Sequence, residues 1–597
     1  MSKKSIQVLA STGATIVVLG VLALFVWQVV WPAIQDMPFM DIFDPDRNIV
    51  DFHEHHNLDP NVPIIIFDGD RVRDVTPVVE FSGDNATVFL PETLIRELVD
   101  PFLFWDEGAE VFFISSRYEM LEFTPGSSTF LLNDTSTQLS TPIRRDRGEV
   151  YLPADLLTGL YPWLIDFRPT TNVVMITDAS VEQTTAEVIV SHATIRFFST
   201  PRAPIAARLP EGTVLYVFTD EDNLPPDGFV RVRTPDGIVG YAEPGDLSPF
   251  VTGVPSLGRQ PMLREWLLNF TNHPPNFPPE KRINMVWEAM ETFGGNTTRM
   301  DNGPFHDSVN VVSPQWFRID ETGSFMDSIA SMEYVDWAQS QGALVWPKVF
   351  DENHVRVSRF LPNREARRVA INQLINYADA LNLDGLNIDF EHLSPAEAPY
   401  KIQFLRELAI PMRERGLVLS AAVLVPIPNY NMFYRRDLIG LTVDFVMVMT
   451  YDEHWATAPT AVPNASLPWV QRAIENMLRE VPNEKLVLGL PFYVRKWREV
   501  VRDGALTSRA VSMNYARNFF EERNVDWEWN SEIGSYFGEV AVTEDNEAVI
   551  WRTWLECERS IRAKMQFFVA YDLAGVAAWR RLLENEETQI VIGSFFE

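Results

Sequence analysis

Residues 383–393 read LDGLNIDFEHL, in which acidic side chains are threaded through an apolar run typical of a buried strand. Buried strands rarely tolerate unpaired carboxylates. Because successive side chains on a strand point to opposite faces, Asn387, Asp389 and Glu391 share one face. The other face carries Leu386, Ile388 and Phe390, with Asp384 at the start of the strand. We therefore expect the polar row to face a cavity or another polar surface.

Apolar strand-like runs alternate with helical segments from Arg282 onward. The runs lie at 283–290, 309–314, 343–350, 383–391, 417–426, 444–454, 485–493 and 575–579. Eight strands separated by helices predict a (β/α)8 TIM barrel over residues 278–597. The active site of such a barrel lies at the C-terminal ends of its strands. Glu391 ends the fourth run and Tyr451 lies near the end of the sixth, so both are expected at the barrel mouth.

The stretch DGLNIDFE resembles the DxxDxDxE signature of glycoside hydrolase family 18, with Asn387 in place of the middle Asp. The segments MVMTYD and GLPFY and the strand-closing Trp579 occur in the order that this family shows. MTYDEHW, VIWRTWLECERS and YDLAGVAAW resemble the bacterial subgroup that contains spore-cortex and cell-wall N-acetylglucosaminidases. No LysM repeat, which binds glycan in many relatives, is visible in the sequence.

The resemblance implies substrate-assisted catalysis, in which the 2-acetamido oxygen of the sugar attacks the anomeric carbon. Glu391 would be the general acid, Asp389 would orient the acetamido N–H and stabilise the oxazolinium ion, and Tyr451 would donate to the acetamido oxygen. The two close carboxyl groups would help Glu391 to stay protonated near neutral pH. In a purely structural alternative, Asp389 and Glu391 pair with lysines or arginines of the barrel.

The resemblance also implies a set of substrate-binding residues, namely Asn387, Met447, Met449, Asp452, Tyr493 and Trp579. Asp384, on the helix side of its strand, is expected to support the structure through hydrogen bonds. Trp579 is expected to form the floor of the sugar subsite, whereas flanking subsites or the core could take Trp346, Trp455 and Trp497. Neither a cofactor nor a metal is expected, because His392 and His454 lack a ligand-spaced partner.

The N-terminus is predicted to anchor the chain in a membrane. Lys3 and Lys4 precede an uncharged stretch to Gln35 with a dense apolar run at 16–30, which is long enough to span a bilayer. Acidic residues follow the stretch, so the positive-inside rule places the N-terminus in the cytoplasm and the rest outside the cell. A cleaved signal peptide is the alternative, but its apolar region is usually shorter, about 7 to 15 residues.

Between this segment and the barrel, the sequence predicts two linkers and two small domains. Residues 36–60 and 250–277 read as linkers, and the histidines at 53, 55 and 56 lack further partners for a closed metal site. Residues 61–180 contain a gapless α+β repeat with an offset of 62, as from Pro91 to Pro153. The repeat resembles the copper amine oxidase N-terminal-like domain, a stalk or wall-binding module here without a copper site. Residues 186–249 resemble a bacterial SH3-like β-barrel.

Composition excludes several classes of function. The chain has 50 Lys and Arg against 82 Asp and Glu, a formal charge of −32, which argues against a nucleic-acid partner. Its one cysteine, Cys557, excludes an intramolecular disulfide and is expected to be buried.

Together these features predict a membrane-anchored extracellular glycosidase with retaining chemistry. Its expected substrate is peptidoglycan, cleaved at β-1,4 bonds of N-acetylglucosamine-containing strands. Chitin or chitooligosaccharides are the alternative substrates, because the catalytic motif does not distinguish them. A non-catalytic glycan-binding scaffold is the third possibility, which the presence of Asp389, Glu391 and Tyr451 disfavours.

Overall fold

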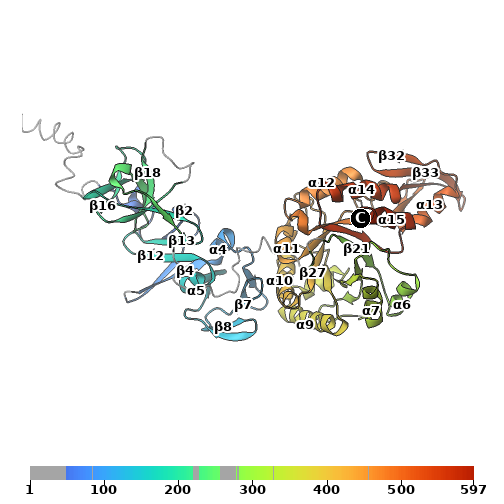
Figure 1. Cartoon of the computed structure of the whole chain (residues 1–597), viewed down its shortest axis with the longest axis horizontal. Helices are drawn as coiled ribbons and strands as arrows, with labels where there is room; N and C mark the ends of the chain where they lie inside the picture. The colour runs from blue at the N-terminus through green and yellow to red at the C-terminus, as the bar shows by residue number, and fades with distance from the viewer. Residues whose placement is uncertain are drawn as a thin grey trace, which may run out of the picture. The chain divides into compact units, whose positions relative to one another are not determined.

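The computed structural model describes residues 49–83, 85–219, 228–255, 277–278, 281–326, 328–454 and 456–596. The predicted membrane segment, residues 1–35, lies outside the described residues, as do most of the two predicted linkers. Among the residues that are described, none of the helices is both long and apolar enough to cross a bilayer. The chain divides into two compact units (Figure 1), one of residues 1–94 and 145–262, the other of residues 95–144 and 263–597.

The second unit contains the predicted barrel. Its strands are β21 (Ile283–Glu288), β22 (Val311–Pro314), β24 (Leu344–Val345), β25 (Lys348–Phe350), β26 (Gly385–Asp389), β27 (Val418–Leu424), β28 (Phe445–Met449), β29 (Leu486–Pro491) and β35 (Gly575–Trp579). They pair in parallel in the order β25-β26-β27-β28-β29-β35-β21-β22-β24, with β23 (Phe317–Arg318) beside β25. The first pairs with the last, Ile283 opposite Gly575. Every strand-like run of the sequence therefore supplies a barrel strand.

The third predicted run is interrupted in the structure. Trp346 and Pro347 separate β24, which pairs with β22, from β25, which pairs with β26. Proline has no N–H to donate to a neighbouring strand, so the ladder breaks at this point. The carbonyl of Pro347 still accepts from the backbone N–H of Asn387 at 3.0 Å, which joins the run to the fourth strand.

Helices surround the barrel strands, as Figure 1 shows. They are α6 (Gly294–Asp301), α7 (Met332–Ser340), α8 (His354–Phe360), α9 (Arg364–Leu381), α10 (Ala398–Glu414), α11 (Arg436–Thr442), α12 (Leu467–Met477), α14 (Glu558–Ala570) and α15 (Glu586–Gly593). The alternation within β26 follows the expectation from the sequence. Phe390, just past the strand, contacts the rings of Phe360 in α8 and Phe404 in α10, so the apolar face meets the helices.

An antiparallel subdomain interrupts the barrel between its seventh and eighth strands, where the sequence reading expected only helical segments. It consists of β30 (Tyr493–Val500), β31 (Leu506–Ser512), α13 (Met513–Glu521), β32 (Glu528–Asn530), β33 (Ser535–Glu544) and β34 (Glu547–Leu555). The sheet order is β31-β30-β34-β33-β32. Because β30 begins two residues after β29 ends, the subdomain rises directly from the strand ends where the active site is expected.

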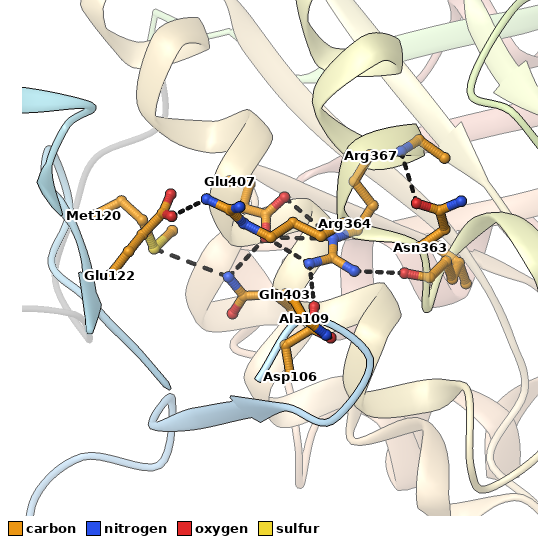
Figure 2. Close-up of polar contacts among 11 residues, drawn as sticks. Asp106, Ala109, Met120, Glu122, Asn363, Arg364, Arg367, Gln403 and Glu407 are labelled. Atoms are coloured by element: carbon orange, nitrogen blue, oxygen red, sulfur yellow. Dashed lines mark hydrogen bonds and ion pairs between the residues drawn. The ribbon is translucent and has the colours of Figure 1, made fainter. Parts of the chain in front are cut away.

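Residues 95–144 belong to the barrel unit although they lie inside the predicted 61–180 domain. They form one sheet of β5 (Phe104–Asp106), β6 (Val111–Ser115), β7 (Met120–Phe123), β8 (Thr129–Leu132) and β9 (Thr135–Gln138). Figure 2 shows the charged contacts that join this sheet to α9 and α10. Arg367, fully buried, donates to Asp106 at 2.8 Å and to Glu407 at 3.2 Å, and Arg364 pairs with Glu122.

Apolar and cationic contacts complete the attachment of this sheet to the barrel. Phe113 and Met120 pack against Ile410 of α10. Arg406, also buried, donates to the hydroxyl of Ser115 at 2.9 Å and to the carbonyls of Ser115 and Ser116 at 2.8 Å. The two helices of the barrel therefore hold the sheet through specific hydrogen bonds as well as hydrophobic packing.

The sequence repeat divides between the two units. The strands β4 (Asn85–Pro91) and β11 (Glu149–Pro153) pair antiparallel, with Leu90 opposite Leu152, as the prediction that the copies pair requires. The helices α4 (Glu92–Leu98) and α5 (Ala154–Leu160) follow them. The hairpin of the first copy, β5–β6, lies in the sheet on the barrel, whereas that of the second, β12 (Trp163–Arg168) and β13 (Val173–Asp178), pairs with β1 (Ile64–Phe67). The similar hairpins thus have different neighbours, because β13 finds β1 as a parallel partner.

The rest of the first unit is antiparallel β structure. The strands β2 (Asp70–Val72), β3 (Val78–Ser82) and β10 (Arg144–Asp146) complete the two four-stranded sheets around β13 and β4. A further sheet has the order β16-β15-β19-β18-β17-β14-β20. Its strands are β14 (Gln183–Glu187), β15 (His192–Arg196), β16 (Ile205–Pro210), β17 (Val214–Val217), β18 (Val230–Arg233), β19 (Val239–Ala242) and β20 (Val251–Gly253). The sheet therefore extends a few residues beyond both bounds of the 186–249 domain that we predicted as SH3-like.

The described end of the first predicted linker, residues 49–60, is folded rather than extended. The helix α3 (Phe52–His56) begins after Asp51, whose carboxylate caps it by accepting from the backbone of His53 at 2.9 Å. Phe52 is buried in the core of the β14–β20 sheet, and His55 stacks on Phe197 with 3.7 Å between ring centroids. The burial of Phe52 in this core explains why the acidic segment folds. Within the described residues no group of side chains is arranged to hold a metal.

Candidate active site

Strand β26 delivers the polar row to the barrel mouth. Gly385 opens the strand where a side chain has no room, because a Cβ there would lie 2.5 Å from the carbonyl oxygen of Val418 and 2.9 Å from the Trp346 ring. Asp389 and Glu391 both line a cavity of about 760 Å³. The cavity is also lined by residues from the ends of other strands and from the antiparallel subdomain, among them Lys348, Met449, Tyr451, Asp452, Tyr493, Arg495 and Trp579. Of these residues, the sequence analysis had placed Asp389, Glu391, Met449, Tyr451, Asp452, Tyr493 and Trp579 near the site.

Asp389 forms a buried ion pair with Lys348, which stands at the start of β25. The two side chains are about 4% and 7% exposed. The Lys348 ammonium also lies 4.7 Å from the centre of the Trp579 ring and 5.1 Å from that of Phe350. The cation engages Oδ2 of Asp389, whereas Oδ1 is buried and has no hydrogen-bond donor among the described residues. The structural alternative for Asp389, pairing with a barrel lysine, is thus realised, but the second oxygen stays available.

Glu391 is arranged to hold a proton. Burial first, and then the charge of Asp389, raise the pKa of Glu391 from 4.5 to about 8, while Lys348 and Lys401 act in the opposite direction. Lys401 is buried and donates to the carbonyl of Phe390 at 3.0 Å. The hydroxyl of Tyr434 donates to the Glu391 carbonyl and accepts from the backbone N–H of Leu393 at 3.0 Å, which fixes the backbone on both sides. At neutral pH Glu391 is therefore a carboxylic acid on a rigid support, as a general acid must be.

Asn387, expected among the substrate-binding residues, lies beneath the cavity and does not line it. Its oxygen accepts from the Trp287 indole N–H at 3.0 Å, and its amide nitrogen donates to Ser420 at 3.0 Å and to the sulfur of Met447 at 3.7 Å. Both Asn387 and Met447 are fully buried. With all of these partners inside the barrel, the two residues support the catalytic strand from below instead of contacting a sugar.

Tyr451 and Asp452 follow the sixth barrel strand, β28, and Tyr493 follows the seventh, β29. Tyr451 and Tyr493 meet edge to face, with 6.1 Å between ring centroids, and both line the cavity. Burial raises the pKa of Tyr451 well above its usual value, and neighbouring Tyr493 and Asp389 add to the effect, so its hydroxyl keeps its proton and can donate. Asp452 pairs with Arg495 from β30. A residue of the antiparallel subdomain thus holds a side chain at the end of the sixth barrel strand.

The tryptophans separate into cavity and core. Trp579 lines the cavity, with its ring 6.1 Å from that of Trp287. Trp346 and Trp497 are almost completely buried: the first packs against Phe445, and the second donates to the carbonyl of Val462 at 3.0 Å. These two are core residues and not subsites, whereas Trp455 lies outside the described residues.

Asp384 has the structural surroundings that its strand face indicated. Its Oδ2 accepts from the backbone N–H of Val345 at 2.9 Å and from the side chain of Gln339 at 3.0 Å. It therefore ties the fourth strand to the short β24 and to α7, away from the cavity.

Sequence reasoning missed four cations that line the cavity, namely Lys348, Arg495, Arg299 and Arg580. Lys348 could have been found, because a lysine inside the apolar run ALVWPKVF raises the same question as the acids of the fourth strand. Arg495 had no comparable signal, since its subdomain was not predicted. Arg580 directly follows Trp579 but carries no recognisable motif.

Comparison with known proteins agrees with this geometry. Residues 351–583 match the family model described as Glycosyl hydrolases family 18. The glycosylase YvbX of Bacillus subtilis is 24% identical over 298 residues, which cover 47% of this chain and 83% of that relative. The cortical fragment-lytic enzyme of Bacillus subtilis is 26% identical over 246 residues, or 40% of this chain and 56% of the relative. The chain thus spans little more than half of the latter enzyme.

A solved structure aligns with a similar share of this chain. The Bacillus cereus spore cortex-lytic enzyme SleL aligns with 53% of this chain and 75% of its own, at 17% identity and a TM-score of 0.47. The family match includes strand β26 with Asp389 and Glu391, the two tyrosines and Trp579, whereas Lys348 and Arg299 of the cavity precede the matched range. The chain therefore contains, at residues 351–583, a domain that matches glycoside hydrolase family 18.

Proposed function

We propose that this protein is a retaining glycosidase that cleaves β-1,4 bonds of N-acetylglucosamine-containing glycans by substrate-assisted catalysis. The observation that carries the proposal is the buried pair of Asp389 and Glu391 at the cavity. Glu391, with a pKa of about 8, keeps a proton at neutral pH, while Lys348 balances a negative charge on Asp389. One carboxyl group is thus ready to give a proton and the other to stabilise a cation.

In the first step, Glu391 would protonate the glycosidic oxygen as the bond from that oxygen to the anomeric carbon breaks. The carbonyl oxygen of the 2-acetamido group would attack the same carbon from the other face and form an oxazolinium ion. The free oxygen of Asp389 would accept from the acetamido N–H and stabilise the positive charge. Tyr451, whose hydroxyl keeps its proton, would donate to the acetamido oxygen.

In the second step, the Glu391 carboxylate would take a proton from water, which attacks the anomeric carbon and reopens the ring. Two inversions at one carbon retain its configuration. The acid of the first step is restored, so no proton is gained or lost by the enzyme over one cycle.

Peptidoglycan is the proposed substrate, and chitin or its oligomers are the second candidate. Peptidoglycan is favoured by the similarity to a cortical fragment-lytic enzyme. The stalk-like repeat and the small β domain before the barrel also fit attachment in a cell wall, which is their proposed role. Digestion of purified peptidoglycan and of chitin oligomers, followed by mass spectrometry of the new reducing-end sugar, separates the two candidates.

The proposed location is the outer face of the cell membrane, with residues 1–35 as an uncleaved anchor. The uncharged segment behind Lys3 and Lys4 supports this proposal. The full-length protein should then begin near Met1 and stay with the membrane after a salt wash. A soluble form that starts near residue 36 would instead identify a cleaved signal peptide.

The test of the catalytic assignment is Glu391→Gln. An amide cannot donate the required proton, so turnover should fall by about 10²- to 10⁴-fold while glycan binding persists. Glu521→Gln, at an exposed position on α13, is the matched control and should retain wild-type turnover. Near-normal hydrolysis by the Glu391 variant would remove this residue from the mechanism.

A further inference from the structure

The cavity carries a cation that the mechanism does not use. Arg580 directly follows Trp579 at the end of the eighth barrel strand and lines the same cavity. Its side chain is partly buried, yet no ion pair or hydrogen bond joins its guanidinium to another of the described residues. Partly buried guanidinium groups normally have a partner, because removing a charge from water without one is costly. Arg580 therefore lacks the partner that a partly buried guanidinium normally has, and it lies next to a tryptophan that lines the cavity.

The neighbouring cations of this region are, in contrast, satisfied. Lys348 pairs with Asp389, and Arg495 pairs with Asp452. Arg581, the next residue along the chain, pairs with Glu288 at 2.5 Å and donates to the carbonyl of Gly303 at 2.6 Å. The next arginine along the chain is thus held by a carboxylate and by backbone carbonyls, whereas Arg580 has no such partner among the described residues.

Arg299 is a second cavity-lining guanidinium without a carboxylate partner. Its one hydrogen bond to the described residues goes to the carbonyl of Ala289 at 2.6 Å, which is neutral. Burial, and then the positive charge of Arg299, lower the pKa of Arg580, so the two cations face a common region. Two like charges held close together favour the binding of an anion between or beside them.

Acidic residues on the same wall do not neutralise the two arginines. Glu291 lines the cavity and its charge acts on Arg580, but it is exposed and forms no ion pair with it. The two arginines therefore stay without an ion-pair partner among the described residues, although the chain as a whole has a formal charge of −32.

We propose that Arg580 and Arg299 form an anion subsite that binds a carboxylate carried by the glycan. Trp579 would stack on the sugar ring, and the arginine next to it in the chain would reach a substituent at the edge of that ring or of its neighbour. A planar guanidinium matches the two oxygens of a carboxylate. Sugars with a 3-O-lactyl group or an attached peptide carry such a carboxylate, whereas polymers of N-acetylglucosamine alone are neutral. The subsite rests on the proposed glycosidase function and would select peptidoglycan over chitin.

The test compares charged and neutral substrates with the full-length protein. The three substrates are a neutral chitooligosaccharide, a peptidoglycan strand whose peptides an amidase has removed to leave lactyl carboxylates, and the same strand with its peptides. For Arg580→Gln, the ratio of kcat/KM on a carboxylate-bearing strand to that on the neutral oligomer should fall by about 10- to 100-fold, mainly through KM. For Arg580→Lys this ratio should fall less, because lysine keeps the charge but lacks the planar guanidinium.

Two further variants check that the change in the ratio is specific to the charge of Arg580. Arg562→Gln, at an exposed position on the outer helix α14, should leave the substrate ratio unchanged. Glu291→Gln removes a cavity carboxylate whose charge acts on Arg580, and it should raise the ratio. Because the readout is a ratio within one protein, a variant with less folded protein changes both rates equally and does not imitate the effect.

The outcomes distinguish a failure of the proposed subsite from a failure of the proposed glycosidase function. A loss only with the amidase-treated strand identifies the lactyl carboxylate, since the peptide-bearing strand holds this group as an amide. A loss only with the peptide-bearing strand identifies a peptide carboxylate, and a loss with both shows that the subsite accepts either. An unchanged ratio in Arg580→Gln, with an active wild-type enzyme, overturns the subsite and leaves the glycosidase proposal intact. A wild-type enzyme that cleaves none of the three substrates overturns the proposed function itself.

Discussion

Replacing Lys348 by Met tests whether this lysine controls the catalytic acid. Methionine has a similar length and no charge, so the substitution removes the ion pair with Asp389 and little else. Lys348 is also one of the two cations that lower the pKa of Glu391. Without it, the carboxyl pair should hold its shared proton over a wider pH range. The alkaline limb of activity, which needs protonated Glu391, should therefore move to higher pH while the rate falls.

The size of the shift follows from the strand geometry. Residues two apart on a strand are separated by roughly 6 to 7 Å, so Lys348 beside Asp389 lies roughly 6 to 10 Å from Glu391. At an effective dielectric constant of about 20, a unit charge at that separation contributes about 1.7 to 2.8 kcal/mol, or one to two pH units. The limb should then move from about pH 8 to about pH 9–10. Without Lys348 to hold it, the Asp389 carboxylate is less well placed to stabilise the oxazolinium ion, which should lower kcat by about 10²- to 10³-fold.

The assay is the pH dependence of kcat/KM on a fluorogenic chitooligosaccharide. Lys348→Arg keeps the charge and should keep the limb near pH 8, and circular dichroism verifies that both variants are folded. Loss of one partner of a buried pair should also reduce the free energy of unfolding by about 3 to 5 kcal/mol at most. A limb that stays at pH 8 or moves down in Lys348→Met would refute the electrostatic role of this lysine.

The remaining predictions concern stability and the nucleophile. The folded state binds a proton at Glu391 that the unfolded state releases between pH 4.5 and about 8, so the free energy of unfolding should fall as the pH rises through this window. Scanning calorimetry at several pH values should show a smaller fall for Glu391→Gln, and an equal fall would contradict the raised pKa. Arg406→Met strands the carbonyls of Ser115 and Ser116 and should cost about 2 to 4 kcal/mol in urea unfolding, whereas Arg562→Met should cost almost nothing; equal effects would show that the buried contact is not stabilising. De-N-acetylated glycan should resist hydrolysis and a thiazoline analogue should inhibit, since substrate assistance needs the acetamido oxygen. Equal rates on acetylated and deacetylated chains of the same length, without inhibition, would point to an enzyme carboxylate as the nucleophile.

The catalytic strand was predictable because its evidence is local. Side chains two apart share one face of any strand, so Asp389 and Glu391 had to point the same way, and Phe390 had to point to the helices. The order of the strand-like runs predicted the barrel, and a parallel barrel gathers its strand ends at one mouth. Tyr451 and Trp579 could therefore be assigned to the cavity without coordinates.

Other expectations depended on contacts between distant segments. The tryptophans at 346, 497 and 579 look alike in the sequence, but two are buried by aromatic or backbone partners and only Trp579 lines the cavity. The Asn387 side chain shares the face of the catalytic acids, yet Trp287, Ser420 and Met447 occupy all its hydrogen-bonding groups. A position on the correct face does not decide how deep a residue lies in a barrel.

The sequence by itself determined which side chains share the face of the fourth strand and reach the barrel mouth, because alternation along a strand and the succession of strands are properties of the chain alone. Only the tertiary structure decided how these residues are charged. Lys348 comes from another strand and Lys401 from a covering helix, and their distance to the carboxyl groups exists only after folding. The division of the sequence repeat has the same origin, since the identity of its pairing strands, β1 for one hairpin and β7 for the other, depends on which edges meet in space. Electrostatic and pairing energies depend on separation in space, which a local pattern does not specify.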